Sequence, residues 1–294
     1  MPKPIAVDEI KTQKLVLQTT CVGGRGIVAA VSNFLAERDC YINELAQFDD
    51  RESKNLFMRV AFEIETGDYT KEKIIAEFPE IADKFGMTWQ IHSATAPTRT
   101  LIMVSKFDHC LVDLLYRHQK GELNVDITAV VSNHKDLRPM VEREGIRFIH
   151  LPMTKDTKVK QEQALRDIIK ETKTELVVLA RYMQILTNEL CRDLSGRAIN
   201  IHHSFLPGFK GALPYHQAYE RGVKLIGATA HYVTADLDEG PIIEQAVQPV
   251  DHSFGPKMLV SVGRDTETVA LARAVKLHTE HRVFLDGNKT VVFK

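Results

Sequence analysis

Residues 198–211 read AINIHHSFLPGFKG, and residues 231–241 read HYVTADLDEGP. At the start of the first segment apolar and polar side chains alternate, which predicts a strand that projects Asn200 and His202 together from one face. The residues that follow favour irregular backbone and end the strand: Pro207, Gly208 and Gly211. Loops at the ends of rigid strands often present reactive side chains, so the stretch is typical of an active site in a protein of strands and helices.

Composition is that of an ordinary globular protein. The 294 residues are 44% hydrophobic and 26% charged, enough for one large or two ordinary domains. Lys and Arg number 38 against 39 Asp and Glu, without the basic excess of a nucleic-acid-binding protein. The chain has no apolar run near the roughly 18 residues of a membrane span, and its start, MPKPIAVDEIK, lacks the apolar segment of a signal peptide. We expect a cytoplasmic protein that binds neither membrane nor nucleic acid.

The cysteines are widely spaced and form no CxxC pair. They are Cys21, Cys40, Cys110 and Cys191. This spacing predicts neither a disulfide framework nor a zinc knuckle, so we expect small, buried or partly buried side chains.

The first part of the chain predicts a small antiparallel sheet with two helices on one face. The expected strands are Lys14–Thr20, Tyr41–Asp49, Leu56–Glu65 and Thr88–His92, and the expected helices are Ile27–Arg38 and Lys71–Phe85. This βαββαβ order ends before a short polar segment with a proline, residues 94–98, which we interpret as a linker. We therefore expect one domain over residues 1–93 and a second over residues 99–294.

In the second part, strand and helix patterns alternate. The expected strands lie within residues 99–105, 125–133, 147–152, 175–180 and 198–202, and the expected helices are 108–120, 136–144, 158–172 and 188–194. Near-continuous apolar runs such as Leu176–Leu179 suit a parallel sheet covered on both faces, so we predict a doubly wound α/β domain. Ligands bind at the carboxyl ends of the strands in such sheets, where Asn200 and His202 lie. A last helix over Asp265–Glu280 and a hairpin turn at Asp286–Asn288 are expected after it.

The polar side chains of the opening stretch suit attack on a carbonyl carbon. The amide of Asn200 can donate to an oxygen that gains negative charge, an interaction worth roughly 3 kcal/mol in a transition state. His202 can donate to the same oxygen or pass a proton near neutral pH. A carboxylate is needed as well, and Asp236 and Asp238 are the nearest candidates. Spacing alone does not choose between them.

Other interpretations of these residues stay open. Taken singly, an Asn at a strand end is usually a turn or cap residue, and a His beside an apolar run is usually a hydrogen-bonded core residue. A metal site is another alternative, with His202, His203, His231, Asp236 and Asp238 as ligands. We do not expect one, because His202 and His203 would point to opposite faces while the strand continues.

The motifs resemble the folate-dependent formyltransferase fold, whose hallmark is Asn-x-His followed by Ser-x-Leu-Pro-x-Phe and later by Asp-x-Asp-x-Gly. The matching positions are Asn200, His202, Ser204, Leu206, Pro207, Phe209, Asp236, Asp238 and Gly240. The resemblance implies a Rossmann-like domain in which Asn200, His202 and Asp238 are catalytic. It also implies that two segments line a pterin pocket, with Tyr182, Met183, Ile185, Leu186, Thr234, Ala235 and Asp236 as the folate-binding residues.

Further details resemble the deformylase branch of that family, which releases formate from 10-formyltetrahydrofolate. They are the doubled histidine of INIHHSFLP, the segment Pro214–Ala218 and GATAHYVTADLDEGPII. The ribonucleotide transformylases of the family have a glycine-rich phosphate turn where this chain reads Ser105–His109, without glycine and with a carboxylate, so a phosphorylated acceptor would be poorly held. The resemblance implies hydrolysis by water, with formate for purine synthesis and balanced folate pools as the outcome and with no cofactor beside the folate substrate. Two alternatives are formyl transfer to another amine and a sensor that binds folate without turnover.

The βαββαβ segment resembles an ACT domain, a module that commonly binds a small amino acid at a dimer interface. The resemblance implies an effector such as glycine or methionine near the loop after the first strand and the start of the second. The expected effector-binding residues are Gly24, Arg25, Gly26 and Asn43, and a homo-oligomer is expected. The loop departs from the family pattern, because Gly23 and Arg25-Gly26 stand where an Asp and a Pro-Gly pair are usual. A dimerisation module without an effector is the alternative.

Overall fold

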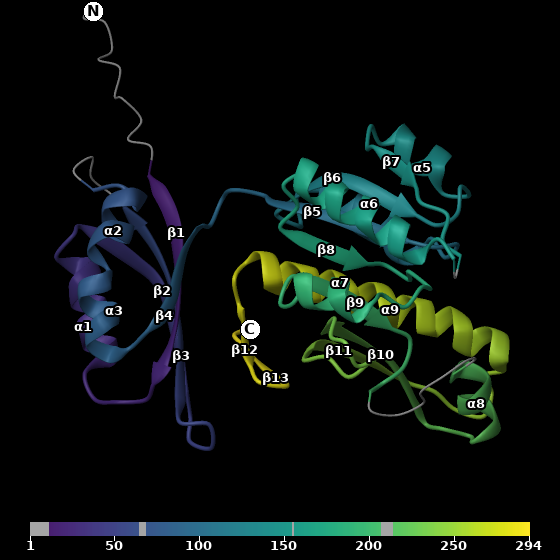
Figure 1. Cartoon of the computed structure of the whole chain (residues 1–294). Helices are drawn as coiled ribbons and strands as arrows, with labels where there is room; N and C mark the ends of the chain where they lie inside the picture. The colour runs from purple at the N-terminus through teal and green to yellow at the C-terminus, as the bar shows by residue number, and fades with distance from the viewer. Residues whose placement is uncertain (1–11, 65–68, 155, 207–213) are drawn as a thin grey trace, which may run out of the picture. The chain divides into compact units, whose positions relative to one another are not determined.

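The computed structural model describes residues 12–64, 69–154, 156–206 and 214–294 (Figure 1). The chain divides into two compact units between Ala96 and Pro97, within the expected linker of residues 94–98. Each unit is described by itself below. The loop expected at Pro207, Gly208, Phe209 and Gly211 lies outside the described residues.

The first unit is a four-stranded antiparallel sheet with helices on one face. Its elements are β1 (Gln13–Val22), α1 (Ile27–Ala36), β2 (Cys40–Asp50), β3 (Asn55–Ile64), α2 (Lys71–Glu77), α3 (Pro79–Phe85) and β4 (Thr88–Ser93). The strand order is β2-β3-β1-β4. Apolar side chains from alternate positions of the strands pack against all three helices in one core, as the period of two predicted.

The single helix expected over Lys71–Phe85 is in fact two helices. Pro79 is the first residue of α3, where its missing N–H costs nothing. In the middle of one long helix the same proline would remove a hydrogen bond and clash with the preceding turn. The chain therefore ends α2 at Glu77 and begins a new helix after Phe78.

The second unit contains a seven-stranded sheet and a separate two-stranded one. Its elements are β5 (Thr98–Val104), α4 (His109–Gln119), β6 (Val125–Ser132), α5 (Arg138–Arg143), β7 (Phe148–His150), α6 (Lys158–Glu171), β8 (Leu176–Leu179), α7 (Asn188–Asp193), β9 (Ala198–His202), α8 (Pro214–Glu220), β10 (Leu225–Tyr232), β11 (Ile242–Pro249), α9 (Pro256–Thr279), β12 (Val283–Asp286) and β13 (Lys289–Val292). The large sheet has the order β11-β10-β9-β8-β5-β6-β7. The hairpin expected at Asp286–Asn288 is confirmed, because β12 pairs antiparallel with β13 across it.

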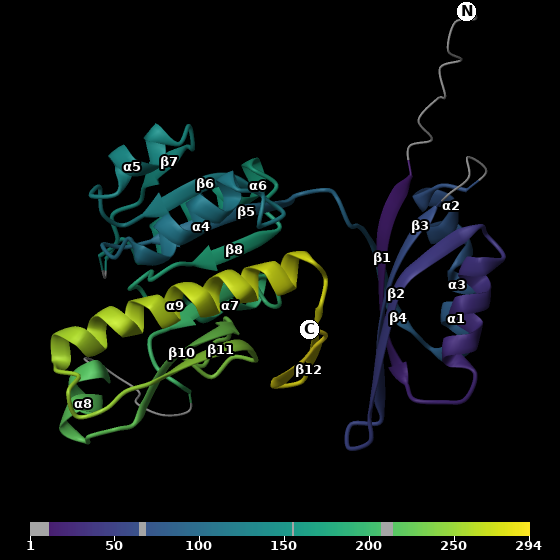
Figure 2. The ribbon, with the colours of Figure 1, turned by 180° about the vertical axis from the view of Figure 1, so that it is seen from behind.

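Helices cover both faces of the large sheet. Helices α4, α5 and α9 pack on one face, and α6 and α7 pack on the other (Figures 1 and 2). The doubly wound arrangement follows from strands that are apolar on both sides, such as β8, all of whose residues are buried.

The sheet is mixed, which corrects the expectation of a parallel sheet. Strands β5 to β9 run parallel to their neighbours, but β10 runs antiparallel to both β9 and β11. Residues 233–241 connect β10 to β11, and so short a loop reverses the chain instead of making the crossover that parallel strands require.

Helix α9 begins at Pro256, nine residues before the expected start at Asp265. Pro256 occupies the first turn, where proline is favoured, and Gly263 lies in the helix interior. Glycine normally weakens a helix. A Cβ at Gly263, however, would collide with the ring of Tyr215. The glycine therefore permits a close contact between α9 and α8.

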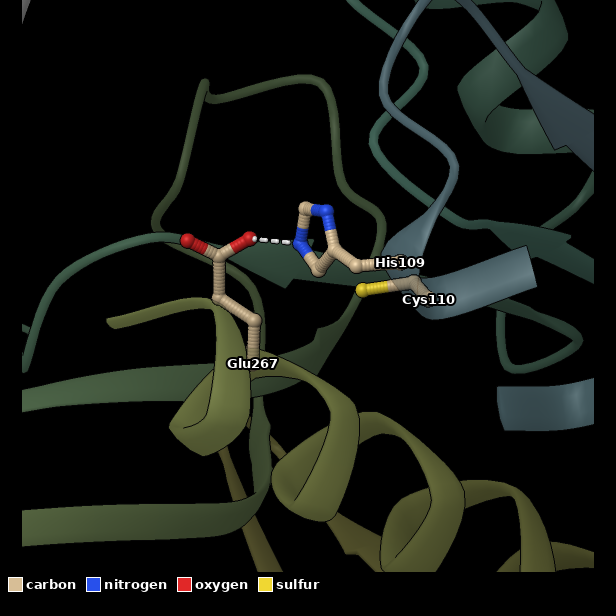
Figure 3. Close-up of side chains that lie close together, drawn as sticks. All are labelled: His109, Cys110 and Glu267. Carbon is tan, nitrogen blue, oxygen red and sulfur yellow. Dashed lines mark hydrogen bonds and ion pairs between the residues drawn. The ribbon is translucent and has the colours of Figure 1, made fainter. Parts of the chain in front are cut away.

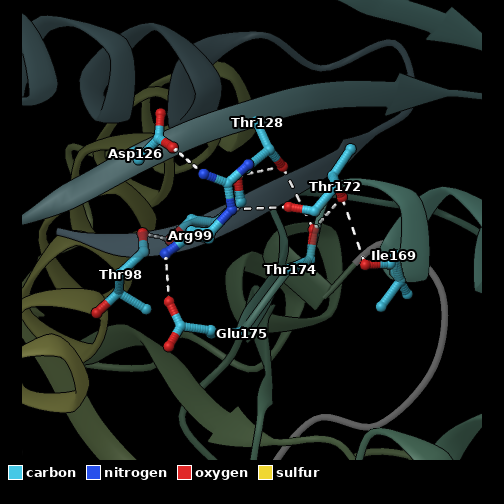
Figure 4. A network of polar contacts seen from close by, with 9 residues as sticks. Thr98, Arg99, Asp126, Thr128, Ile169, Thr172, Thr174 and Glu175 are labelled. Atoms are coloured by element: carbon cyan, nitrogen blue, oxygen red, sulfur yellow. Dashed lines mark hydrogen bonds and ion pairs between the residues drawn. The ribbon is translucent and has the colours of Figure 1, made fainter.

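A polar network joins the amino ends of three central strands (Figure 4). Arg99 at the start of β5 donates from Nε to Thr172 O at 2.8 Å and from Nη1 to Asp126 Oδ2 at 3.0 Å. Its backbone N–H donates to Glu175 Oε2 at 2.8 Å. The network stabilises this edge of the sheet, which is opposite the carboxyl ends of the strands.

Candidate active site

A cavity of about 580 Å³ opens at the carboxyl ends of β8 and β9, within the size range of small-molecule sites. All the catalytic and folate-binding residues that the sequence predicts line it: Asn200, His202, Asp238, Tyr182, Met183, Ile185, Leu186, Thr234, Ala235 and Asp236. The structure therefore brings together two segments that are about fifty residues apart in the chain. The four expected effector-binding residues belong to the first unit.

The pairing of β9 with β10 places His231 directly opposite Asn200. The Nδ1 of His231 lies 2.8 Å from Tyr232 O, and because a carbonyl only accepts, Nδ1 carries the proton. The other ring nitrogen, Nε2, then accepts from Asn200 Nδ2 at 3.3 Å. Burial, as the largest cause, lowers the pKa of His231 and keeps this ring neutral. One hydrogen of the Asn200 amide is thus held, and the orientation of the amide is set.

Asp238 is the aspartate of the loop that reaches the histidines. Its Oδ1 lies 3.2 Å from His202 Nδ1 and 3.8 Å from His231 Nε2, whereas Asp236 is exposed. Asp238 has a φ of 57°, a left-handed conformation that is uncommon outside glycine. A Cβ at Gly240 would collide with Tyr232 O, so the loop packs tightly against the end of β10. The loop geometry, which spacing could not show, distinguishes the two aspartates.

The surroundings of Asp238 keep its carboxylate charged. Burial would raise its pKa, but the hydrogen bond from His202 and the nearby charges of His202, His231 and His203 outweigh burial and lower the pKa below its ordinary value. The second nitrogen of His202 is different: Nε2 is buried and has no hydrogen-bond partner among the described residues. A buried, unpaired nitrogen in a cavity is suited to a substrate atom or to a proton in transit.

The apolar side of the cavity is built on the segment after β8. The Oγ of Ser105 accepts from Met183 N at 2.9 Å and donates to Asn133 Oδ1 at 2.7 Å, which fixes the start of this segment. Tyr182 and Leu186 are buried, while Met183 and Ile185 are 51% and 62% exposed and leave apolar surface for a ligand to cover. Burial, with the charge of Glu162 as a smaller cause, also raises the pKa of Tyr182 and keeps its hydroxyl neutral.

The other side of the cavity carries a buried carboxylate, Glu267, on α9. His109 Nε2 donates to its Oε2 at 2.7 Å, and Tyr215 Oη donates to its Oε1 at 2.8 Å. The Nε of Arg181 lies 3.3 Å from Oε2 and forms an ion pair. Burial would raise the pKa of Glu267, but the His109 hydrogen bond and the Arg181 charge outweigh it and lower the pKa. Glu267 is therefore a fully partnered anion.

One group of potential metal ligands is present among the described residues, and it differs from the expected set. His109, Cys110 and Glu267 offer ligand atoms within 4.8 Å of one another (Figure 3). Burial, followed by the charge of Glu267, raises the pKa of the Cys110 thiol. Glu267 already pairs with the cation of Arg181. These contacts account for the group as an internal hydrogen-bond and ion-pair network.

The argument that His202 and His203 point to opposite faces was wrong. Strand β9 ends at His202, so the alternation stops there and both side chains line the cavity. Their ring centroids lie 4.9 Å apart. Burial, with the charges of Arg181 and His202, lowers the pKa of His203 to about 4. His203 is thus neutral at physiological pH.

Sequence reasoning missed several residues of the site. His231 was weighed only as a metal ligand, although an antiparallel pairing of its strand with β9 would have placed it opposite Asn200. Arg181, Tyr215 and Glu267 were not singled out. A glutamate in an otherwise small and apolar helix stretch, ETVALARAV, is the one signal that marks a buried, partnered carboxylate.

The fold and the site define a formyl transferase. Residues 98–275, most of the second unit, match the model of the family described as Formyl transferase. A glycinamide ribonucleotide transformylase from Symbiobacterium toebii has a similar structure, with a TM-score of 0.64 at 27% identity; the match covers 69% of this chain and 97% of that one.

Longer matches narrow the class. A curated formyltetrahydrofolate deformylase from Corynebacterium sp. (strain P-1) is 53% identical over 95% of this chain and 98% of its own length. One from Escherichia coli (strain K12) is 40% identical over 95% and 98%. The crystal structure of a formyltetrahydrofolate deformylase from Burkholderia mallei superposes with a TM-score of 0.91 at 53% identity, covering 96% of this chain and all of that one. The chain belongs to the formyltetrahydrofolate deformylase family.

No helix in the described ranges has both the length and the apolar character needed to cross a membrane.

Proposed function

We propose that this protein hydrolyses 10-formyltetrahydrofolate to formate and tetrahydrofolate, with Asn200, His202 and Asp238 as its catalytic residues. The observation that carries the proposal is the meeting of these side chains in one cavity, with Asp238 Oδ1 3.2 Å from His202 Nδ1. Membership of the deformylase family supports the same reaction.

In this mechanism water replaces an amine as the nucleophile. The Asp238–His202 pair takes one proton from the water while the water oxygen attacks the formyl carbon. The free hydrogen of the Asn200 amide and a protonated His202 Nε2 donate to the oxyanion that forms. The bond between the carbon and N10 then breaks, N10 gains a proton through His202 or solvent, and formate leaves. His231 holds Asn200 in place throughout by accepting its other amide hydrogen.

The pterin and its linker bind in the apolar side of the cavity. Tyr182, Met183, Ile185 and Leu186 contact one face of the ligand, and the loop of Thr234, Ala235 and Asp236 contacts its edge. The Thr234 Oγ1 donates to Asp236 O at 3.0 Å, which holds the loop in a turn. This binding supplies orientation, which is a large part of catalysis for a single bond-breaking step. The folate is the substrate, and no further cofactor is needed.

Release of formate in the absence of any added amine tests the function. We expect formate and tetrahydrofolate in equal amounts from purified protein and 10-formyltetrahydrofolate alone. Strict dependence on an amine acceptor would instead support the alternative function, a folate-dependent formyltransferase. Folate binding without any turnover would indicate a sensor. In the cell, the released formate would supply purine synthesis and the reaction would balance the one-carbon folate pools.

We further propose that the first unit is an ACT-like regulatory domain. Its order of strands and helices and its β2-β3-β1-β4 sheet support the assignment. The expected effector loop leads into α1 through Gly26, whose φ of 82° suits glycine. Asn43 lies where the register of β2 with β3 shifts, and its Nδ2 donates to Glu63 Oε1 at 3.3 Å. Gly24, Arg25, Gly26 and Asn43 form the effector site in this proposal, and glycine or methionine is its ligand.

Calorimetric titration with glycine and with methionine tests the effector site. The wild-type protein should bind one of them, and the Arg25→Ala variant should bind it more weakly. Light scattering of the full chain tests the accompanying proposal of a homo-oligomer, and cell fractionation tests the cytoplasmic location. Absence of binding for both amino acids, with an intact oligomer, would leave a dimerisation module.

A further inference from the structure

The two sides of the cavity differ in chemistry. One side is apolar and partly exposed, whereas the other is a chain of polar groups that begins beside the catalytic imidazole. The ring of His203 lies 4.9 Å from that of His202 and 6.4 Å from that of Tyr215, whose hydroxyl donates to Glu267 at 2.8 Å. Glu267 thus lies two ring contacts away from the reacting centre.

Three separate elements converge on this single carboxylate. Glu267 lies one turn after Gly263 on α9, and the glycine leaves room for the Tyr215 ring of α8. His109, the first residue of α4, donates from a third direction (Figure 3). Arg181 adds its charge, and Phe107 lies against the guanidinium at 5.0 Å. The site is packed from several directions and is built for one carboxylate.

The network is satisfied within the protein. Glu267 is 1% exposed and receives two hydrogen bonds and an ion pair, so its lone pairs are engaged. The cation of Arg181 is balanced by the same carboxylate. Arg264 also lines the cavity, but it is exposed at the surface of α9. An amine acceptor on this side would have to separate a buried ion pair, which is costly. A water molecule requires little space and no such change.

We propose that Glu267, held by His109, Tyr215 and Arg181, is a specificity determinant that closes this side of the cavity to amines and leaves water as the acceptor. The inference rests on the proposed hydrolysis. Hydrolysis and transfer share one balance: a nucleophile bonds to the formyl carbon, the bond to N10 breaks, the nucleophile loses a proton and N10 gains one. Access of the nucleophile therefore determines whether formate or a formylated amine is made.

The partition between the two products tests the inference. Each protein is given 10-formyltetrahydrofolate and a fixed excess of labelled glycinamide, and the ratio of N-formylglycinamide to formate is measured. For wild-type protein we expect formate almost alone. For Glu267→Ala we expect the ratio to rise by about ten-fold or more, the scale of discrimination that steric exclusion provides. Tyr215→Phe, which removes one hydrogen bond but keeps the packing, should raise the ratio less.

Glu162→Ala is the matched control. Glu162 is also 1% exposed and accepts from Thr187 N at 2.9 Å, but it lies outside the described lining of the cavity. It should leave the product ratio unchanged even if it lowers stability. If Glu267→Ala does not fold, Tyr215→Phe and His109→Ala provide the same test. An unchanged ratio in variants that still release formate would overturn the inference, while absence of formate from wild-type protein would overturn the proposed function itself.

Discussion

Asp238 and Glu267 are two carboxylates that line one cavity and are held in opposite ways. Asp238 lies on a loop in a left-handed conformation, and its partner His202 keeps one nitrogen unpaired. Glu267 lies in the interior of a 24-residue helix and is paired with three side chains. Both have a lowered pKa, so charge alone does not distinguish them. The difference indicates that an acid with an open relay acts on substrate, whereas a saturated one shapes the cavity.

Removing the charge of Asp238 should have the largest effect. Asp238→Asn keeps the shape of the side chain but cannot take a proton through His202, so we expect kcat/KM for formate release to fall by about 10³-fold. Steady-state kinetics check this, with folate binding as the control for an intact pocket. A loss of less than about ten-fold would remove Asp238 from the reaction.

Asn200→Ala should have the next largest effect. It deletes the neutral donor to the oxyanion and frees His231 Nε2, and a fall in kcat of about 10²-fold or more is expected for one such donor. KM should change little, because the interaction strengthens only as charge develops. A rise in KM with an unchanged kcat would mean that Asn200 only binds the ground state.

Glu267→Gln should reduce stability more than it reduces chemistry. The amide leaves the Arg181 cation buried without a counter-charge, and breaking a buried pair in this way costs about 3 kcal/mol. The free energy of unfolding in urea at neutral pH measures the loss. Glu162→Gln, whose partner Thr187 is uncharged, should cost about 1 kcal/mol. Equal losses in the two variants would contradict the importance of the ion pair.

The smallest expected effect is a pH dependence from His203, which lies between the two carboxylates. Its pKa falls from 6.5 to about 4 on folding, so the unfolded chain binds a proton in this range and the folded chain does not. Stability is therefore complete above pH 6.5 and decreases as the pH falls toward 4, by roughly 2 kcal/mol. His203→Gln should flatten this part of the curve of stability against pH. An unchanged slope would show that other groups cause the acid sensitivity.

Local patterns predicted much of the fold. Alternation in AINIH predicted that Asn200 and His202 leave the strand together, and both line the cavity. The apolar run of β8 predicted a sheet covered on two faces, and helices from both sides confirm it. The family motif chose Asp238 over Asp236. The catalytic and folate-binding roles of these residues stay predictions.

The remaining features depend on contacts between segments that are distant in sequence. The reversal of β10 depends on where a short loop returns the chain, and the early start of α9 depends on a glycine that makes room for Tyr215. The split at Pro79 was readable, but the apolar pattern continued across it and was given more weight. Glu267 was missed because its partners come from α4, α8 and the segment after β8. No spacing rule along the sequence connects these elements.

The source of the oxygen in formate tests the central claim most directly. Wild-type protein is incubated with 10-formyltetrahydrofolate in ¹⁸O-labelled water, without any amine, and the formate is analysed by mass spectrometry. If water is the acceptor, each formate carries a single labelled oxygen, and Asp238→Asn forms far less of it. Failure to form labelled formate until an amine is added would contradict the account.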